Sequence, residues 1–347
     1  ITAKSSDTSP VTLAVVRYAI FRSVASLLCA LLQRKKATML TTTLNTNNIH
    51  ASFCWVVNLC VHQLTDFSNR YQTKSFFCII FVVVANQMLE IAIEAAVEAG
   101  RLLKINAGKV MHIDRKLGQE TNLVTETDKK AEELIIRKIK KRYPHHDFLA
   151  EESGGSEEKS EYKWIIDPLD GTTNFTHGMP IFCVSIGLEV KGEMTLGVVY
   201  NPNLDELFTA EKGKGAFLNK RRMSVSKTSK LIESLIVTGF PYDIRSRPES
   251  IIMHLNNLLL EAQAVRRLGS AALDLCYVAA GRFDGYWENT LNPWDMAAGV
   301  LLLEEAGGLF TDFLGFPTTI YKKQVLATNR IIHDQMIAVL KKGIVKD

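Results

Sequence analysis

The chain has 347 residues, of which 47% are hydrophobic and 22% are charged, and its formal net charge is +4. This composition is ordinary for a folded protein, and the length provides for one large domain or two smaller ones. Because the net charge is small, the overall balance does not indicate that a nucleic acid is required as a partner.

Charge and glycine are unevenly distributed along the chain. Residues 1–87 contain eight Lys or Arg, two Asp and no Glu, so their net charge is +6, whereas residues 88–347 have a net charge of −2. All 21 glycines follow residue 87, although average usage of about 7% would place roughly six before it. Four of the six cysteines lie in the first part, with spacings that match neither a zinc site nor a disulfide scaffold: Cys29, Cys54, Cys60 and Cys78. Two sequences of different character therefore join near Met88.

Three interpretations of residues 1–87 are open. A membrane anchor is disfavoured, because Val11–Leu32 carries two arginines and Phe76–Ala85 is shorter than the about 20 residues of a spanning helix. An organelle transit peptide agrees with the basic, Ser/Thr-rich composition but not with the length. A segment that is not native coding sequence is the interpretation we favour, since the chain does not open on Met. We expect residues 88–347 to be cytoplasmic and to need no membrane, with organelle targeting only if the first segment is genuine.

Two helices are predicted first after this segment. Leu89–Ile105 places alanines and leucines at nearly helical spacing, which is typical of an amphipathic helix. The second helix is expected to have Thr127 or Asp128 as its N-cap and to run to about Tyr143, before Pro144 ends it.

Strands dominate the next part of the chain. The predicted strands, of which the third and fourth form a hairpin, are Phe148–Ala150, Lys163–Ile166, Ile181–Val190, Met194–Tyr200, Glu206–Ala210 and Gly215–Leu218. His145 and His146 are interpreted as surface residues, because adjacent side chains point apart on an extended chain. Cys183 and Cys276 lie in apolar contexts and are interpreted as buried thiols.

Beyond Ser234 helices and strands alternate. The expected strands are Leu235–Thr238, Val265–Leu268, Gly285–Glu288 and Val325–Ala327, and the expected helices are Glu249–Ala262, Ala271–Ala280, Pro293–Ala306 and Ile331–Lys341. The change of pattern predicts two halves, residues 88–234 with the metal and phosphate motifs and residues 235–347 completing the metal site and the substrate pocket.

The string Trp164–Phe175 is the most informative part of the chain. An apolar strand leads directly to Asp167 and Asp170, and Pro168 between them is expected to stop the strand. A bend there can turn both carboxylates and the Leu169 carbonyl toward one point, and hard cations such as Mg²⁺ prefer oxygen ligands of this kind.

Several acids must converge if two dications are to be held together. Two such ions about 4 Å apart repel by roughly 17 kcal/mol at an effective dielectric constant near 20. Glu151, Asp167, Asp170 and Asp295 supply four negative charges from three separate segments.

Gly171, Thr172 and Thr173 follow these aspartates at the expected start of a helix. Their N–H groups lack intrahelical partners and favour an anion, and Gly171 lets a phosphate approach the backbone closely. The Thr172 hydroxyl is placed to orient a metal-bound water. Metal ligands beside an anion site are typical of a magnesium-dependent phosphatase.

Three signatures in the chain resemble those of the inositol monophosphatase family, which is lithium-sensitive: Glu151-Glu152-Ser153, Asp167–Phe175 and Trp294–Gly299, with further similarity through Glu304–Gly308. The resemblance covers about residues 88–342. It implies an α/β (α+β) fold, a layered α-β-α-β-α sandwich, which is usually a homodimer.

The resemblance also implies the roles of the site residues. Glu151, Asp167 and the Leu169 carbonyl would hold a first Mg²⁺, and Asp167, Asp170 and Asp295 a second, while a third, weaker ion would rely on Glu151. Glu151 and Thr172 would orient the attacking water, with Asp170 as a further catalytic residue. The expected substrate-binding residues are Asp170, Gly171, Thr172, Thr173, Gly269, Ser270, Ala271 and Glu288.

On the substrate side, Gly269-Ser270-Ala271 resembles the family's sugar-facing turn, and Glu288 falls where the family has a carboxylate that accepts inositol hydroxyls. Asp128 resembles a carboxylate behind the metals, and Lys116 is offset by one position from a lysine that family members often have. Arg266-Arg267 is either a steering pair for a phosphorylated substrate or a surface pair.

The function that follows is hydrolysis of a phosphate monoester of a small polyol, with myo-inositol monophosphate as the expected substrate. Alternative substrates within the superfamily are fructose-1,6-bisphosphate, histidinol phosphate and a 3′-phosphoadenosine nucleotide. A hypothesis of another class is a binding protein, because some bacterial relatives that resemble this chain associate with RNA polymerase.

Overall fold

The computed structural model describes residues 74–109, 113–115, 123–155, 160–242, 244–246 and 248–342. The chain separates into two compact units, residues 1–80 and residues 81–347. Of the first unit only residues 74–80 are described, and they are helical. The interpretations of Val11–Leu32 and of the first three cysteines, and the expectation for Lys116, lie outside the described residues.

The helices of the described chain are α3 (Lys74–Asn106), α4 (Glu126–Arg142), α5 (Thr172–Thr176), α6 (Pro248–Glu261), α7 (Ala271–Ala279), α8 (Pro293–Glu305) and α9 (His333–Lys341), with 3-10 turns at Leu231–Glu233 and Ile244–Ser246. The strands are β1 (Ile113–Arg115), β2 (Leu123–Thr125), β3 (Asp147–Ala150), β4 (Gly154–Gly155), β5 (Tyr162–Asp170), β6 (Cys183–Val190), β7 (Glu193–Asn201), β8 (Glu206–Glu211), β9 (Gly215–Leu218), β10 (Arg221–Arg222), β11 (Leu235–Thr238), β12 (Ala264–Arg266), β13 (Gly285–Asn289), β14 (Leu309–Thr311) and β15 (Gln324–Thr328).

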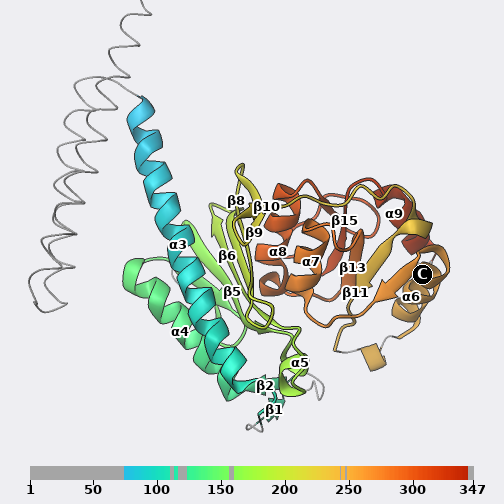
Figure 1. Cartoon of the computed structure of the whole chain (residues 1–347), viewed down its shortest axis with the longest axis horizontal. Helices are drawn as coiled ribbons and strands as arrows, with labels where there is room; N and C mark the ends of the chain where they lie inside the picture. Colours follow the sequence, from blue (N-terminus) through green and yellow to red (C-terminus); the bar gives the residue numbers. More distant parts are fainter. Residues whose placement is uncertain are drawn as a thin grey trace, which may run out of the picture. The chain divides into compact units, whose positions relative to one another are not determined.

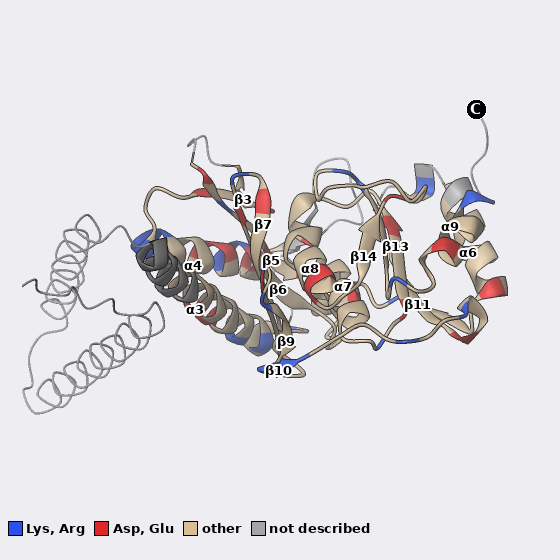
Figure 2. Cartoon of the chain, turned by 90° about the horizontal axis from the view of Figure 1, so that it is seen from above, with Lys and Arg blue, Asp and Glu red and all other residues tan. Residues whose placement is uncertain are grey.

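An eight-stranded sheet has the order β10-β9-β8-β7-β6-β5-β3-β4. Among the described strands of this sheet, only β3 and β5 pair in parallel. Helices α3 and α4 cover one face of this sheet, as Figures 1 and 2 show. Their small and branched side chains, such as Ala96 and Ile135, form one core with Trp164 and Ile166 of β5. The alanines of the first predicted helix are buried in this core, so the prediction of an amphipathic helix from their spacing is confirmed.

A second, five-stranded sheet has the order β12-β11-β13-β15-β14. Helices α7 and α8 fill the layer between the two sheets, and α6 and α9 cover the outer face of the second one (Figure 2). Two glycines allow α8 to approach the first sheet closely, since a Cβ on Gly197 would lie 2.8 Å from the Ala298 carbonyl oxygen and one on Gly187 would lie 2.9 Å from the Ala297 Cβ. The layers follow the expected α-β-α-β-α order.

Strand β5 continues through Pro168, where the sequence predicted its end. Asp167 pairs with Ser185 and Asp170 pairs with Cys183, so three steps along β5 face two steps along β6. This extra residue is a β-bulge, which tolerates a proline because the ladder is interrupted there. The strand therefore bends at Pro168 instead of ending.

Other boundaries also differ from the predictions. Thr125, and not Thr127 or Asp128, is the N-cap of α4, because its side chain accepts from the Thr127 and Asp128 N–H groups while Asp128 caps in return. Strand β12 lies at Ala264–Arg266, slightly earlier than predicted. The short strands β1, β2, β4, β10 and β14 were not predicted. Among the described residues, no helix has the length and apolar character needed to cross a membrane.

Candidate functional site

A cavity of about 340 Å³ opens where the bulge of β5, the N-termini of α5, α7 and α8, and the ends of β11 and β13 meet. It is lined by nearly all the predicted site residues: Glu151, Asp167, Leu169, Asp170, Gly171, Thr172, Gly269, Ser270, Ala271, Glu288 and Asp295. Thr173 is the exception, because its side chain is exposed and does not line the cavity.

The bulge decides where the two aspartates of β5 point. Side chains alternate between the faces of a strand, so residues three apart normally face opposite sides. Because the bulge inserts one residue, Asp167 and Asp170 pair with Ser185 and Cys183, which lie on the same face of β6. Both carboxylates consequently face the layer of α7 and α8. Glu151 joins them, since its N–H donates to the Ile166 carbonyl oxygen at 3.2 Å.

Asp170 is held by the start of α7. Its Oδ2 accepts hydrogen bonds of 2.7 Å from the Ser270 hydroxyl and of 2.7 Å from the Ala272 N–H. Burial raises the pKa of Asp170 to about 6, although these hydrogen bonds favour its charged form. The Cys183 thiol also lies 3.8 Å from Oδ2. The Asp170 carboxylate, which belongs to the first sheet, is therefore hydrogen-bonded to the helix layer between the two sheets.

Asp295 reaches the cavity from the first turn of α8. Pro293 begins that helix, and the Asn292 N–H donates to Asp295 Oδ2 at 2.7 Å in a capping box. Burial raises the pKa of Asp295 well above its usual range, and the charges of Glu151 and Asp170 raise it further. Burial and the same group of acids raise the pKa of Asp167 as well. These carboxylates thus repel one another across one cavity.

The donor set fits divalent cations, because four carboxylates and the Leu169 carbonyl provide oxygen ligands and an excess of negative charge. The hydrogen bonds to the chain engage one oxygen each, namely Oδ1 of Asp167 and Oδ2 of Asp170 and Asp295. Within the described part of the chain, no group of three or more His, Cys, Asp or Glu side chains is arranged to hold a metal ion.

An anion site adjoins these acids at the start of α5. Gly171 has φ 96°, a left-handed conformation that glycine adopts without strain, and a Cβ there would lie 3.0 Å from the Ile181 carbonyl oxygen. Asn174 fixes the segment, because its Nδ2 donates to the carbonyl oxygens of Ile181 at 2.7 Å and of Leu268 at 2.8 Å. The asparagine of the motif thereby joins α5 to the Gly269 turn.

Thr172 connects the anion site to a buried carboxylate behind it. Its hydroxyl lies 3.1 Å from the Leu169 carbonyl oxygen and 3.4 Å from Asp128 Oδ1. Asp128 is buried, and its Oδ2 accepts from the N–H and the hydroxyl of Thr125. Burial raises the pKa of Asp128 to about 6. The Thr172 hydroxyl proton thus points at Leu169 and Asp128. The lone pairs of the hydroxyl oxygen remain available to accept a hydrogen bond from another group.

Glu288 stands on the other side of the cavity, near the end of β13. It is 8% exposed, and Tyr286 Oη donates to its Oε2 at 2.5 Å. Burial raises the pKa of Glu288 to about 7. Both residues of the arginine pair are exposed. Arg267 lines the cavity, with its guanidinium 5.6 Å from the centre of the Phe240 ring, whereas Arg266 does not line it.

The cavity is also lined by a group of residues that were not predicted as site residues: Phe240, Pro241, Tyr242, Thr290, Leu291, Asn292 and Trp294. Phe240–Tyr242 and Thr290–Asn292 follow the parallel strands β11 and β13 directly. The segments after the carboxyl ends of neighbouring parallel strands meet at one edge of a sheet, and this rule was the signal that could have found them.

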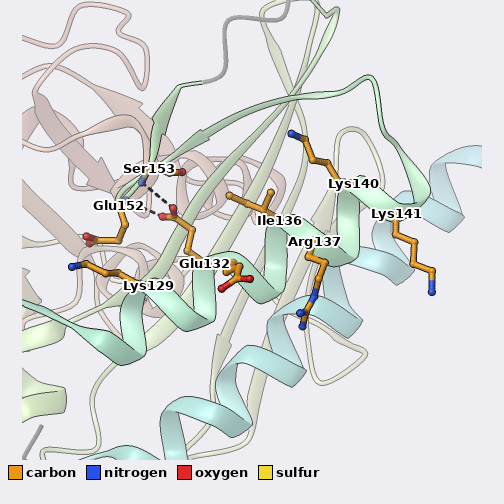
Figure 3. Close-up of a pocket in the computed structure, with 9 residues that line it drawn as sticks. Lys129, Glu132, Ile136, Arg137, Lys140, Lys141, Glu152 and Ser153 are labelled. Atoms are coloured by element: carbon orange, nitrogen blue, oxygen red, sulfur yellow. Dashed lines mark hydrogen bonds between the residues drawn. The ribbon is translucent and has the colours of Figure 1, made fainter.

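Glu132 of α4 is a further missed residue. It is 4% exposed, and its carboxylate accepts the N–H of Glu152 at 2.8 Å and of Ser153 at 2.9 Å (Figure 3). The turn that follows Glu151 is therefore fastened to α4. The signal was an acid four positions after Asp128, on the same face of a helix.

A larger cavity of about 870 Å³ lies beside this turn. Its lining, shown in Figure 3, consists of Lys129, Glu132, Glu133, Ile136, Arg137, Lys140, Lys141, Glu152 and Ser153. None of these described residues belongs to the predicted site, so the smaller cavity is the candidate.

The interpretation of the histidines is wrong for His146. Its ring stacks between Tyr143 and Tyr162, at centroid distances of 4.7 and 4.5 Å, and its Nδ1 accepts from Trp164 Nε1 at 3.0 Å. Only His145 is exposed. The other interpretation is confirmed, since Cys183 and Cys276 are buried free thiols.

Known proteins are similar to this chain over most of its length. The profile of the inositol monophosphatase family matches residues 85–344. An inositol-1-monophosphatase of Mesorhizobium japonicum is 45% identical over 256 residues, which cover 74% of this chain and 96% of that protein. A protein of Pasteurella multocida named Nus factor SuhB is 48% identical over 232 residues, which cover 66% of this chain and 86% of that protein. The crystal structure of extragenic suppressor protein suhB from Bartonella henselae has a TM-score of 0.71 and 44% identity, and covers 74% of this chain and 100% of that one.

Proposed function

The chain belongs to the inositol monophosphatase family, and from this membership we infer that it hydrolyses the phosphate monoester of a small polyol, with myo-inositol monophosphate as the substrate. The relative from Mesorhizobium japonicum is named an inositol-1-monophosphatase, a phosphoric monoester hydrolase. The observation that carries the proposal is the position of Glu288 in the same cavity as the acids and the anion site. One end of a ligand there would meet N–H donors, and its other end would meet a carboxylate that accepts hydroxyl protons.

Two to three Mg²⁺ ions are the proposed cofactors. Glu151, Asp167, Asp170, Asp295 and the Leu169 carbonyl would hold them, because these oxygen donors line the cavity and their mutual repulsion calls for positive charge. When bound, such ions would lower the pKa of a water and neutralise charge on the phosphate oxygens. Activity that requires Mg²⁺ and falls with Li⁺ is the expected result.

The chain's own residues would bind the phosphate and orient the water. The N–H groups of Gly171 and Thr172 would donate to phosphate oxygens at the start of α5. The Thr172 hydroxyl would accept a hydrogen bond from the water, because its proton is directed at Leu169 and Asp128. Glu151 would accept the second proton of that water. No phosphoenzyme is proposed, since burial raises the pKa of the Cys183 thiol and its sulfur faces Asp170.

Phosphate release from a panel of substrates tests this function. The panel contains myo-inositol monophosphate, fructose-1,6-bisphosphate, histidinol phosphate and a 3′-phosphoadenosine nucleotide. We expect the highest kcat/KM for inositol monophosphate and a loss with Glu288→Gln, which accepts hydroxyl protons less strongly. A nucleotide that is hydrolysed a hundredfold faster than inositol monophosphate would show that the substrate assignment is wrong.

A second candidate function is a dual role in which the same chain also binds RNA polymerase. The observation that favours it is the 48% identity to a protein named Nus factor SuhB. Pull-down of RNA polymerase with an Asp170→Asn variant tests this role. Binding retained without phosphatase activity would separate the two functions, whereas no binding by the wild-type chain would remove the second one.

We also propose that the chain forms a homodimer, as the family resemblance implies. Analytical ultracentrifugation gives the test. A single species with twice the mass of the chain is expected, and a monomer at micromolar concentration would contradict it.

A further inference from the structure

The Glu288 carboxylate occupies the space that a side chain on Gly239 would need. Strands β11 and β13 run parallel, with Thr238 opposite Trp287, so the next residues of the two strands are neighbours. The Thr238 hydroxyl donates to the Trp287 carbonyl oxygen at 2.8 Å and fixes this register. Glu288 therefore extends across the Cα of Gly239.

The overlap is large. A Cβ on Gly239 would lie 1.8 Å from Glu288 Oε2, 2.2 Å from its Cδ and 2.3 Å from its Oε1. These distances are far below the roughly 3.5 Å at which a carbon atom and its non-bonded neighbours attract. The backbone gives no reason for glycine at this position, because the residues with positive φ do not include Gly239. Glycine at position 239 therefore leaves the space that the Glu288 carboxylate occupies.

The position of the carboxylate is also fixed from the other side. Tyr286 Oη donates to Glu288 Oε2 at 2.5 Å, and the side chain is 8% exposed. The carboxylate is nevertheless the far end of a flexible side chain that lines the cavity. A methyl group on Gly239 would therefore push it into the cavity and away from the Tyr286 hydroxyl.

We propose that Gly239 is a positioning residue that determines substrate specificity through Glu288. It keeps the carboxylate against β11, at the distance from the anion site that suits a phosphate ester with a hydroxyl remote from its phosphate. The inference rests on the proposed function, because it takes Glu288 as the group that accepts this hydroxyl. Phosphate esters without such a hydroxyl do not depend on the position of Glu288.

Gly239→Ala tests the proposal with two substrates. For myo-inositol monophosphate, kcat/KM is expected to fall by about tenfold or more, because a hydrogen bond to a charged group is lost. For p-nitrophenyl phosphate, which has no hydroxyl, the change is expected to stay within about threefold. Equal losses for both substrates would overturn the proposal, and circular dichroism and thermal unfolding confirm that the variant is folded.

A double-mutant cycle with Glu288→Ala distinguishes this role from a general structural one. Removing the carboxylate frees the space beside Gly239, so Gly239→Ala is expected to have no further effect on either substrate in the Glu288→Ala background. Additive losses would contradict a role through Glu288. If the wild type prefers another polyol phosphate of the panel, the substrate assignment fails, but the same cycle on that substrate still decides the role of Gly239.

Discussion

The Ser270 hydroxyl donates a hydrogen bond of 2.7 Å to Oδ2 of Asp170, a residue 100 positions earlier in the chain. Ser270 is also the N-cap of α7, where its oxygen accepts from the Leu273 N–H at 3.4 Å. One side chain thus begins the helix that separates the two sheets and orients an acid of the candidate metal site. The fold and the site depend on each other at this residue.

Ser270→Ala removes both contacts. We expect kcat/KM to fall by about ten- to hundredfold, because a hydrogen bond to a charged group contributes about 1.5–3 kcal/mol. The lost cap should lower the free energy of unfolding by about 1 kcal/mol. Ser270→Thr is the matched control, since it keeps the hydroxyl. Equal kinetics for the alanine and threonine variants would contradict the role of this hydrogen bond.

Asp295→Asn is expected to abolish turnover and to leave the fold intact. Burial and the neighbouring acids raise the pKa of Asp295, so a neutral side chain relieves repulsion in the metal-free protein. We expect a higher Tm in EDTA, by about 2–4 °C for each kcal/mol gained, and a smaller increase of Tm on addition of Mg²⁺. Thermal scans should show neither change for Asp334→Asn, an exposed acid in the first turn of α9.

Loss of helical circular dichroism in Asp295→Asn would contradict this expectation. The same reasoning applies to Asp167→Asn, because burial and the same acids raise the pKa of Asp167. In both variants the amide retains an oxygen that can accept the hydrogen bond from the backbone, so local structure should persist.

Glu132→Gln tests whether the turn after Glu151 must be fastened to α4. The carboxylate accepts two N–H groups, and an amide can accept only at its oxygen. We expect the Mg²⁺ concentration for half-maximal activity to rise by about tenfold or more, as is typical for partners of metal ligands. Glu133→Gln is the control, because this neighbour is exposed. Unchanged Mg²⁺ dependence would show that Glu151 is held without Glu132.

Much of the fold could be predicted because the pattern of apolar residues is local. The hairpin of β6 and β7 follows from two apolar runs that flank Lys191-Gly192-Glu193, and the bounds of α8 follow from Pro293, Gly307 and Gly308. The start of α3 at Lys74 could not be predicted in this way, since Phe76–Ala85 is uniformly apolar and has no helical periodicity. Thr125 could have been identified as the cap of α4 from its spacing to Asp128, which is that of a capping box.

The site was predictable where its residues form one string, as they do in Asp167–Phe175. What the string does not encode is the pairing with β6, and this pairing puts Asp167 and Asp170 on one face through the bulge. Glu132 and Gly239 act through contacts with residues 20 or more positions away. Such contacts are set by the tertiary fold, so a local pattern can place Glu132 on the helix face of Asp128 but does not indicate which residues Glu132 or Gly239 contacts.

Asp274 gives a prediction on pH, because it is 1% exposed and neither carboxylate oxygen has a hydrogen-bond partner among the residues that the structure describes. Burial raises the pKa of Asp274 well above its usual range, and the charge of Glu288 raises it further. A carboxyl group with a raised pKa in the folded state binds more protons there than in the unfolded state. Its contribution to stability is therefore complete at acid pH and is lost as the pH rises.

Asp274→Asn cannot ionise, so it should be more stable than the wild type at pH 8, and the gain should vanish near pH 4. Urea unfolding at both pH values measures the difference. Asp284→Asn is the opposite control, because Asp284 accepts from the Leu235 N–H at 2.7 Å and the Ser226 hydroxyl at 2.5 Å, so its replacement should destabilise the fold. A gain for Asp274→Asn that is the same at pH 4 and pH 8 would mean that ionisation of Asp274 does not limit stability.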